Sequence, residues 1–116
     1  MRIINKPWGK EIWWAELPDR YLGKILYINE GFRLSLQYHK FKDETLYVLH
    51  GLVEFEVSGI KTLKYPGESI HIPHQTVHRM KAIQYAEIVE VSTYYPEDVV
   101  RLADDHNRIG DNDATL

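Results

Sequence analysis

The 116-residue sequence contains no cysteine, so disulfides, thiolate nucleophiles and cysteine-ligated metals are excluded. Neither positive nor negative charge is in large excess. The formal net charge is only -3 and no basic stripe runs along the chain, which argues against nucleic acid and anionic lipid as partners. No apolar run approaches the length of a membrane span or of a signal-peptide core. We therefore expect a cytoplasmic protein with neither nucleic acid nor a membrane as a partner.

Length and composition set the next limits. A chain of this length is enough for one hydrophobic core and too short for a second domain of useful size. Hydrophobic residues make up 44% of the sequence and charged residues 27%, which is typical of a globular protein rather than a disordered one. The prediction is a single domain over residues 1–116.

The middle of the chain is typical of a β-sandwich or barrel, because short β-branched and aromatic runs alternate with turn residues at intervals of roughly 8–12 residues. Gly51 and Gly59 fall between such runs, where a hairpin needs positive φ, and residues 65–68 form a plain turn signal. The expected strands are residues 23–29, 32–38, 45–50, 52–58, 69–72, 76–80 and 84–92.

One helix is expected, near the C-terminal end. Pro96 suits the first turn of a helix, and apolar residues follow it over 99–103. From residue 104 the sequence becomes polar and loses its periodicity. Residues 104–116 are therefore expected to form a polar tail, flexible over its last few residues.

Alternation along residues 32–39 predicts a metal centre. The odd positions are all polar, so Gln37 and His39 leave the same face of one strand. Glu44 follows an interval long enough for a turn, and His78 comes from a separate strand after Pro73. One amide oxygen, two imidazoles and one carboxylate are ligands for a divalent transition metal. Chemistry alone allows zinc, iron(II), manganese, cobalt or nickel.

The same spacing resembles the cupin family. Residues 31–51 are spaced as in its first motif, with Gln37 in place of the first histidine, and residues 67–78 match its second motif. More narrowly, the chain resembles the C-terminal cupin domain of type II mannose-6-phosphate isomerases, a domain often fused to a mannose-1-phosphate guanylyltransferase. The resemblance extends from about residue 5 to 108, and it is carried by residues 6–9, 33–39, 72–79, 87–92 and 100–108.

The resemblance implies an all-β fold, a cupin double-stranded β-helix or jelly-roll barrel, with zinc held by Gln37, His39, Glu44 and His78. It also implies exchange between mannose 6-phosphate and fructose 6-phosphate. In such a reaction the metal polarises the sugar carbonyl or its neighbouring hydroxyl.

Two further requirements of this reaction select candidate residues. A base must move a proton between C1 and C2, and the candidates are Lys42 and Lys24. The sugar phosphate, the expected small-molecule partner, needs cationic donors. Arg33 is the first candidate to bind the phosphate, because it lies on the same strand face as the metal ligands. The other candidates are Arg79, Arg101 and Arg108.

The sequence also departs from the family pattern, and four of the departures bear on the site. Lys40 begins the segment where the family has a run of histidines, Lys42 replaces an arginine, Gln75 replaces a glycine and Ala82 replaces an asparagine. Lysine is a point charge without the bidentate fork of arginine, and the lost glycine is expected to narrow the mouth of the barrel. Two alternatives therefore stay open, namely an iron-dependent cupin oxygenase and a non-catalytic sugar-binding cupin.

Aromatic residues gather in the first half of the chain, including Trp8, Trp13 and Trp14. We expect them to pack in the core and at a subunit contact rather than to stack on sugars. The apolar face formed by Leu34 and its neighbours on the same strand also needs a cover. A homodimer is the expected assembly.

Overall fold

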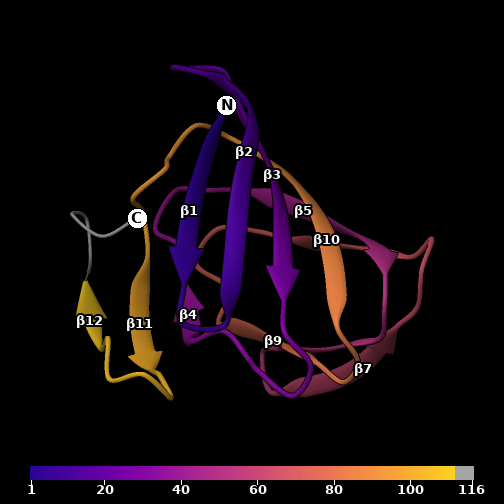
Figure 1. The fold of residues 1–116 in the computed structure, drawn as a ribbon. Coiled ribbons are helices and arrows are strands. Elements are labelled where there is room, and N and C mark those ends of the chain that lie inside the picture. Colours follow the sequence, from indigo (N-terminus) through magenta and orange to yellow (C-terminus); the bar gives the residue numbers. More distant parts are fainter. Residues whose placement is uncertain (112–116) are drawn as a thin grey trace.

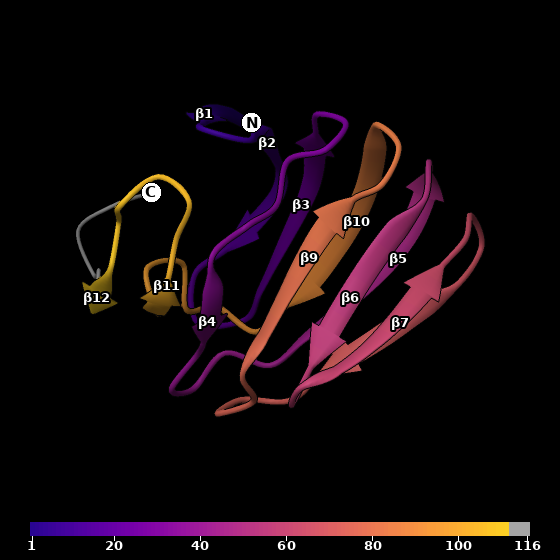
Figure 2. The same cartoon turned by 90° about the horizontal axis from the view of Figure 1, so that it is seen from below.

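Alternating burial along the strands determines the architecture. The computed structural model describes residues 1–111, which fold into two antiparallel six-stranded sheets and contain no helix. The sheets face each other and bury the inward-pointing residues of their strands (Figure 1; Figure 2). The all-β prediction is confirmed.

The first sheet has the strand order β1-β2-β3-β10-β5-β8 and the second has the order β12-β11-β4-β9-β6-β7. The strands of the first sheet are β1 (Arg2–Lys6), β2 (Gly9–Leu17), β3 (Tyr21–Ile28), β10 (Ala86–Ser92), β5 (Glu44–His50) and β8 (Ser69–Ile72). Those of the second are β12 (Gly110–Asp111), β11 (Val100–Ala103), β4 (Leu36–Tyr38), β9 (His78–Ala82), β6 (Val53–Val57) and β7 (Ile60–Lys64).

Every strand that was expected from the sequence has a counterpart. The strand at 69–72 has the expected ends, whereas the one expected over 32–38 is reduced to β4 (Leu36–Tyr38). The turn residues behave as predicted: Gly51 has φ 91°, and a Cβ there would lie 2.1 Å from the carbonyl oxygen of Tyr85. Besides β11 and β12, the strands β1, β2 and β7 were not expected. The last of these is an edge strand that carries two lysines, a composition that weakens the strand signal and protects an exposed sheet edge.

The predicted C-terminal helix is wrong. Residues 100–103 form β11 instead, in which Val100 pairs with Tyr38 and Arg101 pairs with Gln37 of β4. Consecutive β-branched valines at 99 and 100 favour a strand, and β4 offers an edge for them to extend. The chain then turns through residues 104–109 into β12, which pairs with β11. The end of the predicted polar tail, residues 112–116, lies outside the described residues.

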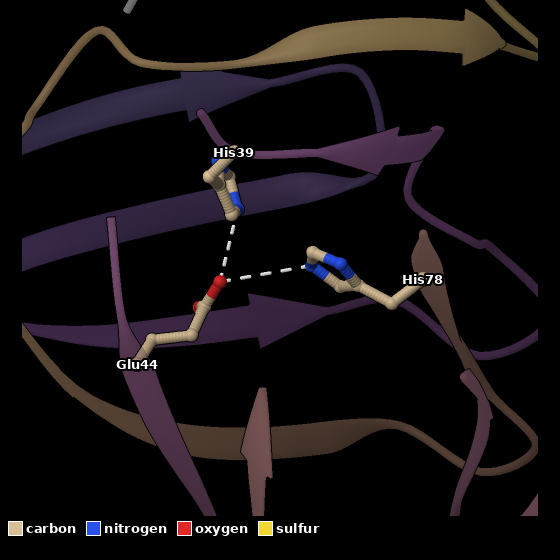
Figure 3. A group of neighbouring side chains, drawn as sticks. All are labelled: His39, Glu44 and His78. Atoms are coloured by element: carbon tan, nitrogen blue, oxygen red, sulfur yellow. Dashed lines mark ion pairs between the residues drawn. The ribbon is translucent and has the colours of Figure 1, made fainter. Parts of the chain in front are cut away.

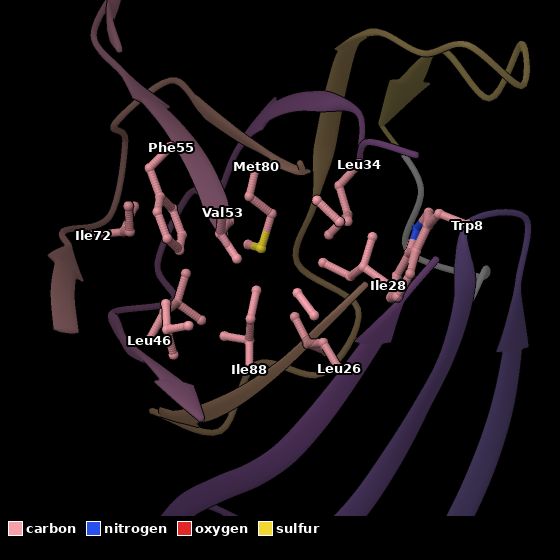
Figure 4. Close-up of a cluster of buried hydrophobic side chains, with 13 residues drawn as sticks. Trp8, Leu26, Ile28, Leu34, Leu46, Val53, Phe55, Ile72, Met80 and Ile88 are labelled. Carbon is pink, nitrogen blue, oxygen red and sulfur yellow. The ribbon is translucent and has the colours of Figure 1, made fainter. Parts of the chain in front are cut away.

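The interior of the barrel divides into an apolar part and a polar part, and single strands contribute to both. In β5 the buried positions change from Glu44 to Leu46 and Val48, and β9 changes in the same way from His78 to Met80. The apolar part is one cluster (Figure 4), whose buried members are Trp8, Leu26, Ile28, Leu34, Leu46, Val48, Val53, Phe55, Ile72, Met80, Ala82, Ala86 and Ile88. None of residues 1–111 belongs to a helix that could cross a bilayer.

Phe55 provides a test of this core. Its side chain is 1% exposed, so Phe55→Ala removes a fully buried ring and is expected to lower the free energy of unfolding by about 3–5 kcal/mol. Ile60→Ala, at a position that is 69% exposed, is the control and should change it by no more than about 0.5 kcal/mol. Urea unfolding of both variants measures the difference. Equal stability losses would contradict this packing.

Candidate metal centre

Three predicted ligands meet inside the polar part of the barrel (Figure 3). His39 follows β4, Glu44 begins β5 and His78 begins β9, so the three side chains come from different strands. Glu44 Oε2 lies 2.9 Å from His39 Nε2 and 3.6 Å from His78 Nε2. All three residues are buried, and their ligand atoms lie within 4.8 Å of one another.

Hydrogen bonds at the far side of each imidazole decide which nitrogen faces the cluster. His39 Nδ1 donates to the backbone carbonyl of Asp98, and His78 Nδ1 donates to the carbonyl of Thr76 at 2.8 Å. Because a carbonyl only accepts, each Nδ1 carries the proton, and in the neutral ring Nε2 presents a lone pair to Glu44. Burial lowers the pKa of His78, which favours its neutral form.

The two imidazole lone pairs point toward the carboxylate oxygen Oε2 of Glu44. This oxygen is buried and accepts no hydrogen bond from any of the described residues. Three electron-pair donors that surround a buried point without a proton between them fit a bound cation, and a carbonyl behind each metal-binding imidazole is the usual outer support. The cluster can therefore hold a divalent metal.

Gln37, the fourth predicted ligand, lies beside this cluster. It pairs with His78 across β4 and β9, and it lines the same cavity as the other three residues. Its coordination of the metal through the amide oxygen stays a prediction. A set of one amide, two imidazoles and one carboxylate matches the donor chemistry of several divalent transition metals.

Lys42 is buried and contacts two carboxylates. Its Nζ lies 3.0 Å from Glu90 Oε2 and 3.8 Å from Glu44 Oε1. Burial alone would lower the pKa of Lys42, but the charges of Glu44 and Glu90 and the hydrogen bond to Glu90 outweigh it and raise that pKa. Burial opposes the ionised form of Glu44 too, yet the charge of Lys42 holds its pKa well below the ordinary value. Lys42 therefore stays protonated at neutral pH.

Lys24, the other lysine predicted to act in catalysis, points into the same cavity. Its Nζ lies 3.3 Å from Glu11 Oε1 and 4.6 Å from the centre of the Trp13 ring. Glu11 also accepts a hydrogen bond from Trp13 Nε1 at 2.9 Å. Lys24 and Glu11 thus form a buried ion pair across β2 and β3 at the cavity wall.

The three arginines predicted to bind phosphate have different surroundings. Arg33 forms a two-pronged contact with Asp105, at 2.7 and 2.8 Å, and does not line the cavity. Arg79 donates from Nε to the carbonyl of Leu34 and is also absent from the cavity wall. Arg101 alone of the three lines the cavity.

Among the departures from the family pattern, Gln75 has a clear structural account. It adopts φ 60°, the left-handed conformation that glycine adopts without cost, and its backbone N–H donates to the carbonyl of His39. Its side chain is exposed and does not line the cavity, so the expected narrowing is not seen. Ala82 is a buried member of the apolar core.

Sequence reasoning missed four polar residues of the cavity, namely Lys6, Glu11, Glu90 and Asp98. Glu90 could have been predicted from the sequence, because it lies two residues from the buried Ile88 on β10 and its side chain therefore points to the same, inner face. Asp98 could not have been predicted in this way. Its carboxylate accepts backbone N–H bonds from residues 40, 41 and 42 at 3.0, 2.7 and 2.9 Å.

Asp98 therefore fixes the segment between two ligands. Burial would raise the pKa of its carboxyl, but the three N–H donors outweigh burial and lower that pKa. The backbone carbonyl of the same residue orients His39. One residue thus holds both the loop from His39 to Glu44 and the ring of His39.

The cavity encloses about 70 Å³, which on this measure is room for about five water molecules. Tyr95, Pro96, Asp98 and Val99, from the connection between β10 and β11, form part of its wall. The space admits a metal ion and the reacting end of a ligand.

A metal-ligand cluster inside a barrel of two antiparallel sheets defines a cupin, and solved structures with the same fold agree. KdgF from Halomonas sp. matches with a TM-score of 0.75 at 21% sequence identity, and the match covers 82% of this chain and 87% of the KdgF chain. An RmlC-like cupin from Shewanella frigidimarina matches with a TM-score of 0.75 at 15% sequence identity, and the match covers 83% of this chain and 86% of the cupin chain.

The model of the family described as mannose-6-phosphate isomerase C-terminal matches residues 1–105, and the chain belongs to this family. Curated relatives include mannose-1-phosphate guanylyltransferases. The protein from Escherichia coli K12 is 30% identical over 93% of this chain, and that from Sinorhizobium fredii is 29% identical over 97%. The match spans 23% of the length of each of these relatives.

Asp98 provides a test of how the cluster is held. Asp98→Ala removes the carboxylate that orders residues 40–42, so the ligands lose their support and zinc affinity is expected to fall by about 10–100-fold. Asp105→Ala removes an exposed carboxylate paired with Arg33 and is the control. Zinc titration against a competing chelator measures both. A folded Asp98→Ala variant with unchanged affinity would refute this role.

Proposed function

We propose that the chain is a metal-dependent sugar-phosphate isomerase domain that interconverts mannose 6-phosphate and fructose 6-phosphate. The observation that carries the proposal is the convergence of His39, Glu44 and His78 on one buried point, in a cavity that three lysines and an arginine also line. Membership of the mannose-6-phosphate isomerase C-terminal family supports this choice of substrate.

The residues that would hold the metal are Gln37, His39, Glu44 and His78, and zinc is the metal we propose. When bound, the metal supplies Lewis-acid polarisation of the sugar carbonyl or its neighbouring hydroxyl. Lys42 lies next to Glu44 and stays protonated, so it supplies a fixed positive charge toward a sugar oxygen that becomes negative during the reaction.

Proton transfer between C1 and C2 is assigned to Lys24 together with Glu11. Because two carboxylates keep Lys42 protonated, it cannot accept a proton at neutral pH. Lys24 and Glu11 are in contact, are buried and reach the same cavity. Burial opposes the ionised form of Glu11, yet the charges of Lys24 and Lys6 lower its pKa, so its carboxylate can take the proton from one carbon and return it to the other while Lys24 holds the carboxylate in place.

A coupled assay tests the activity and its metal dependence. Zinc-reconstituted protein with mannose 6-phosphate is expected to produce fructose 6-phosphate, whereas His39→Ala and His78→Ala lose metal and turnover together. His50→Ala, an exposed histidine at the other end of β5, is the control.

In the same assay Lys24→Met should keep its metal and lose about 10²–10⁴-fold in kcat, while the exposed Lys61→Met is unaffected. Metal-loaded wild-type protein without turnover would refute the isomerase. Binding of the sugar phosphate without turnover would favour a binding cupin, and oxygen consumption with iron would favour an oxygenase.

We also propose a homodimer through the outward face of the first sheet. Ile12, Ile25, Val89 and Tyr47 stand in register across β2, β3, β10 and β5, and Val91 beside them is 50% exposed. This row carries no charge, so two copies related by a two-fold axis meet there without repulsion between like charges.

Light scattering tests the assembly. The wild-type protein is expected to have twice the mass of one chain, and Val91→Asp is expected to have the mass of one, because the charge would be buried at the contact. Thr62→Asp, on the other sheet, is the control. A wild-type protein with the mass of a single chain would contradict the proposal.

A further inference from the structure

Arg101 is a buried cation for which residues 1–111 provide no ion pair or hydrogen bond. Its side chain enters the cavity from β11, the residue is 6% exposed, and neither Nε nor Nη1 has a hydrogen-bond partner. Other arginines of the same region differ, since Arg33 contacts Asp105 and Arg108 contacts Asp104 at 2.9 Å. A guanidinium that is buried and unpaired is strongly unfavourable, so the site suits an anion that residues 1–111 do not supply.

Two more cations border the same recess. Lys6 from β1 and Arg108 line it with Arg101, and Ser35 and Gln37 add polar side chains. Burial lowers the pKa of Lys6 to about 8, and the positive charges of neighbouring Arg101 and Arg108 add to this effect. No ion pair or hydrogen bond of the Lys6 side chain is present within residues 1–111.

The local charges do not cancel. The cations are Lys6, Lys24, Arg101 and Arg108, whereas Glu11 and Asp104 are the carboxylates paired with members of this group. The recess therefore has an excess of two positive charges. This excess matches a phosphate monoester, which carries about −1.5 to −2 charges at neutral pH, better than a carboxylate with one.

The recess lies beside the metal cluster at a fixed spacing. Arg101 pairs with Gln37, and Gln37 pairs with His78, so the three residues stand side by side on β11, β4 and β9 (Figure 2). Two strand spacings separate Arg101 from His78, or about 9–10 Å between backbones. Arg101, Lys6, Gln37 and His78 all line one continuous cavity. A ligand with its anionic group several atoms from its reacting end spans this distance.

We propose that Arg101, Lys6 and Arg108 form a phosphate subsite, which holds the phosphate of a phosphorylated sugar whose other end reaches the cluster of His39, Glu44 and His78. The subsite deepens the proposed function and rests on it for the identity of the sugar. Binding of phosphate itself depends only on the three cations. Arg33, the first choice from the sequence, is already paired and lies outside the cavity.

Thermal unfolding with inorganic phosphate as the probe tests the subsite on the zinc-loaded protein. In phosphate-free buffer, Arg101→Gln is expected to be at least as stable as the wild type, because it removes a buried unpaired charge. Added phosphate should raise the Tm of the wild type and of the control Arg20→Gln, an exposed arginine outside this recess, and leave that of Arg101→Gln unchanged. A merely structural arginine would give the opposite result in phosphate-free buffer.

Phosphorus NMR titration gives the affinity directly. Arg101→Gln is expected to weaken phosphate binding by about tenfold or more, and Lys6→Gln by a similar factor, so the second variant serves if the first does not fold. Equal phosphate affinity in wild type and both variants, or a Tm that phosphate leaves unchanged in the wild type, would overturn the subsite. Phosphate binding that requires Arg101 supports it even if the isomerase assay finds no turnover, and turnover without that dependence refutes the subsite alone.

Discussion

The buried carboxylate of Glu44 is the charge on which the polar part of this barrel depends. It is 4% exposed and contacts three groups, namely His39 and Lys42 from the preceding loop and His78 from β9. An ionised carboxylate in such a place is stable only when cations or donors compensate it. Lys42 supplies part of that compensation, and a metal ion at the imidazole nitrogens would supply the rest.

The fold makes this arrangement possible because single strands contribute both to the apolar core and to the polar cavity. Strands β5, β9 and β10 each place apolar residues in the core and polar residues in the cavity, at the same parity. The core cluster, with Phe55 and Ile88 among its members, therefore fixes the backbones that carry the ligands. Charged neighbours then alternate around the cavity wall, so Lys24 contacts Glu11 and Lys42 contacts Glu90.

The sequence predicted the parts of the site that depend on strand parity and motif spacing. Gln37, His39, Glu44 and His78 were expected to meet, and the three of them that carry ionisable groups form one cluster beside Gln37. It did not predict contacts that depend on chain reversals. Asp98 was assigned to a helix start, whereas its carboxylate holds the loop before Glu44. Strand β11 formed because β4 had an open edge, a tertiary fact that local propensity does not contain.

The choice of phosphate-binding arginine shows the same limit. Arg33 shares parity with Gln37, but the intervening irregular segment and the nearby Asp105 keep it at the surface. Arg101 was one of several candidates, and only its pairing with Gln37 places it in the cavity. Parity along one strand locates a side chain on a face, whereas the pairing of strands decides which charges share a site.

Anomalous diffraction from crystals grown with zinc is the most direct test of the metal centre. The account predicts one strong peak at about 2.0–2.2 Å from Nε2 of His39, Nε2 of His78 and an oxygen of Glu44. A map with no peak at this cluster, and with both imidazoles hydrogen-bonded to Glu44 through protonated Nε2 atoms, would contradict it.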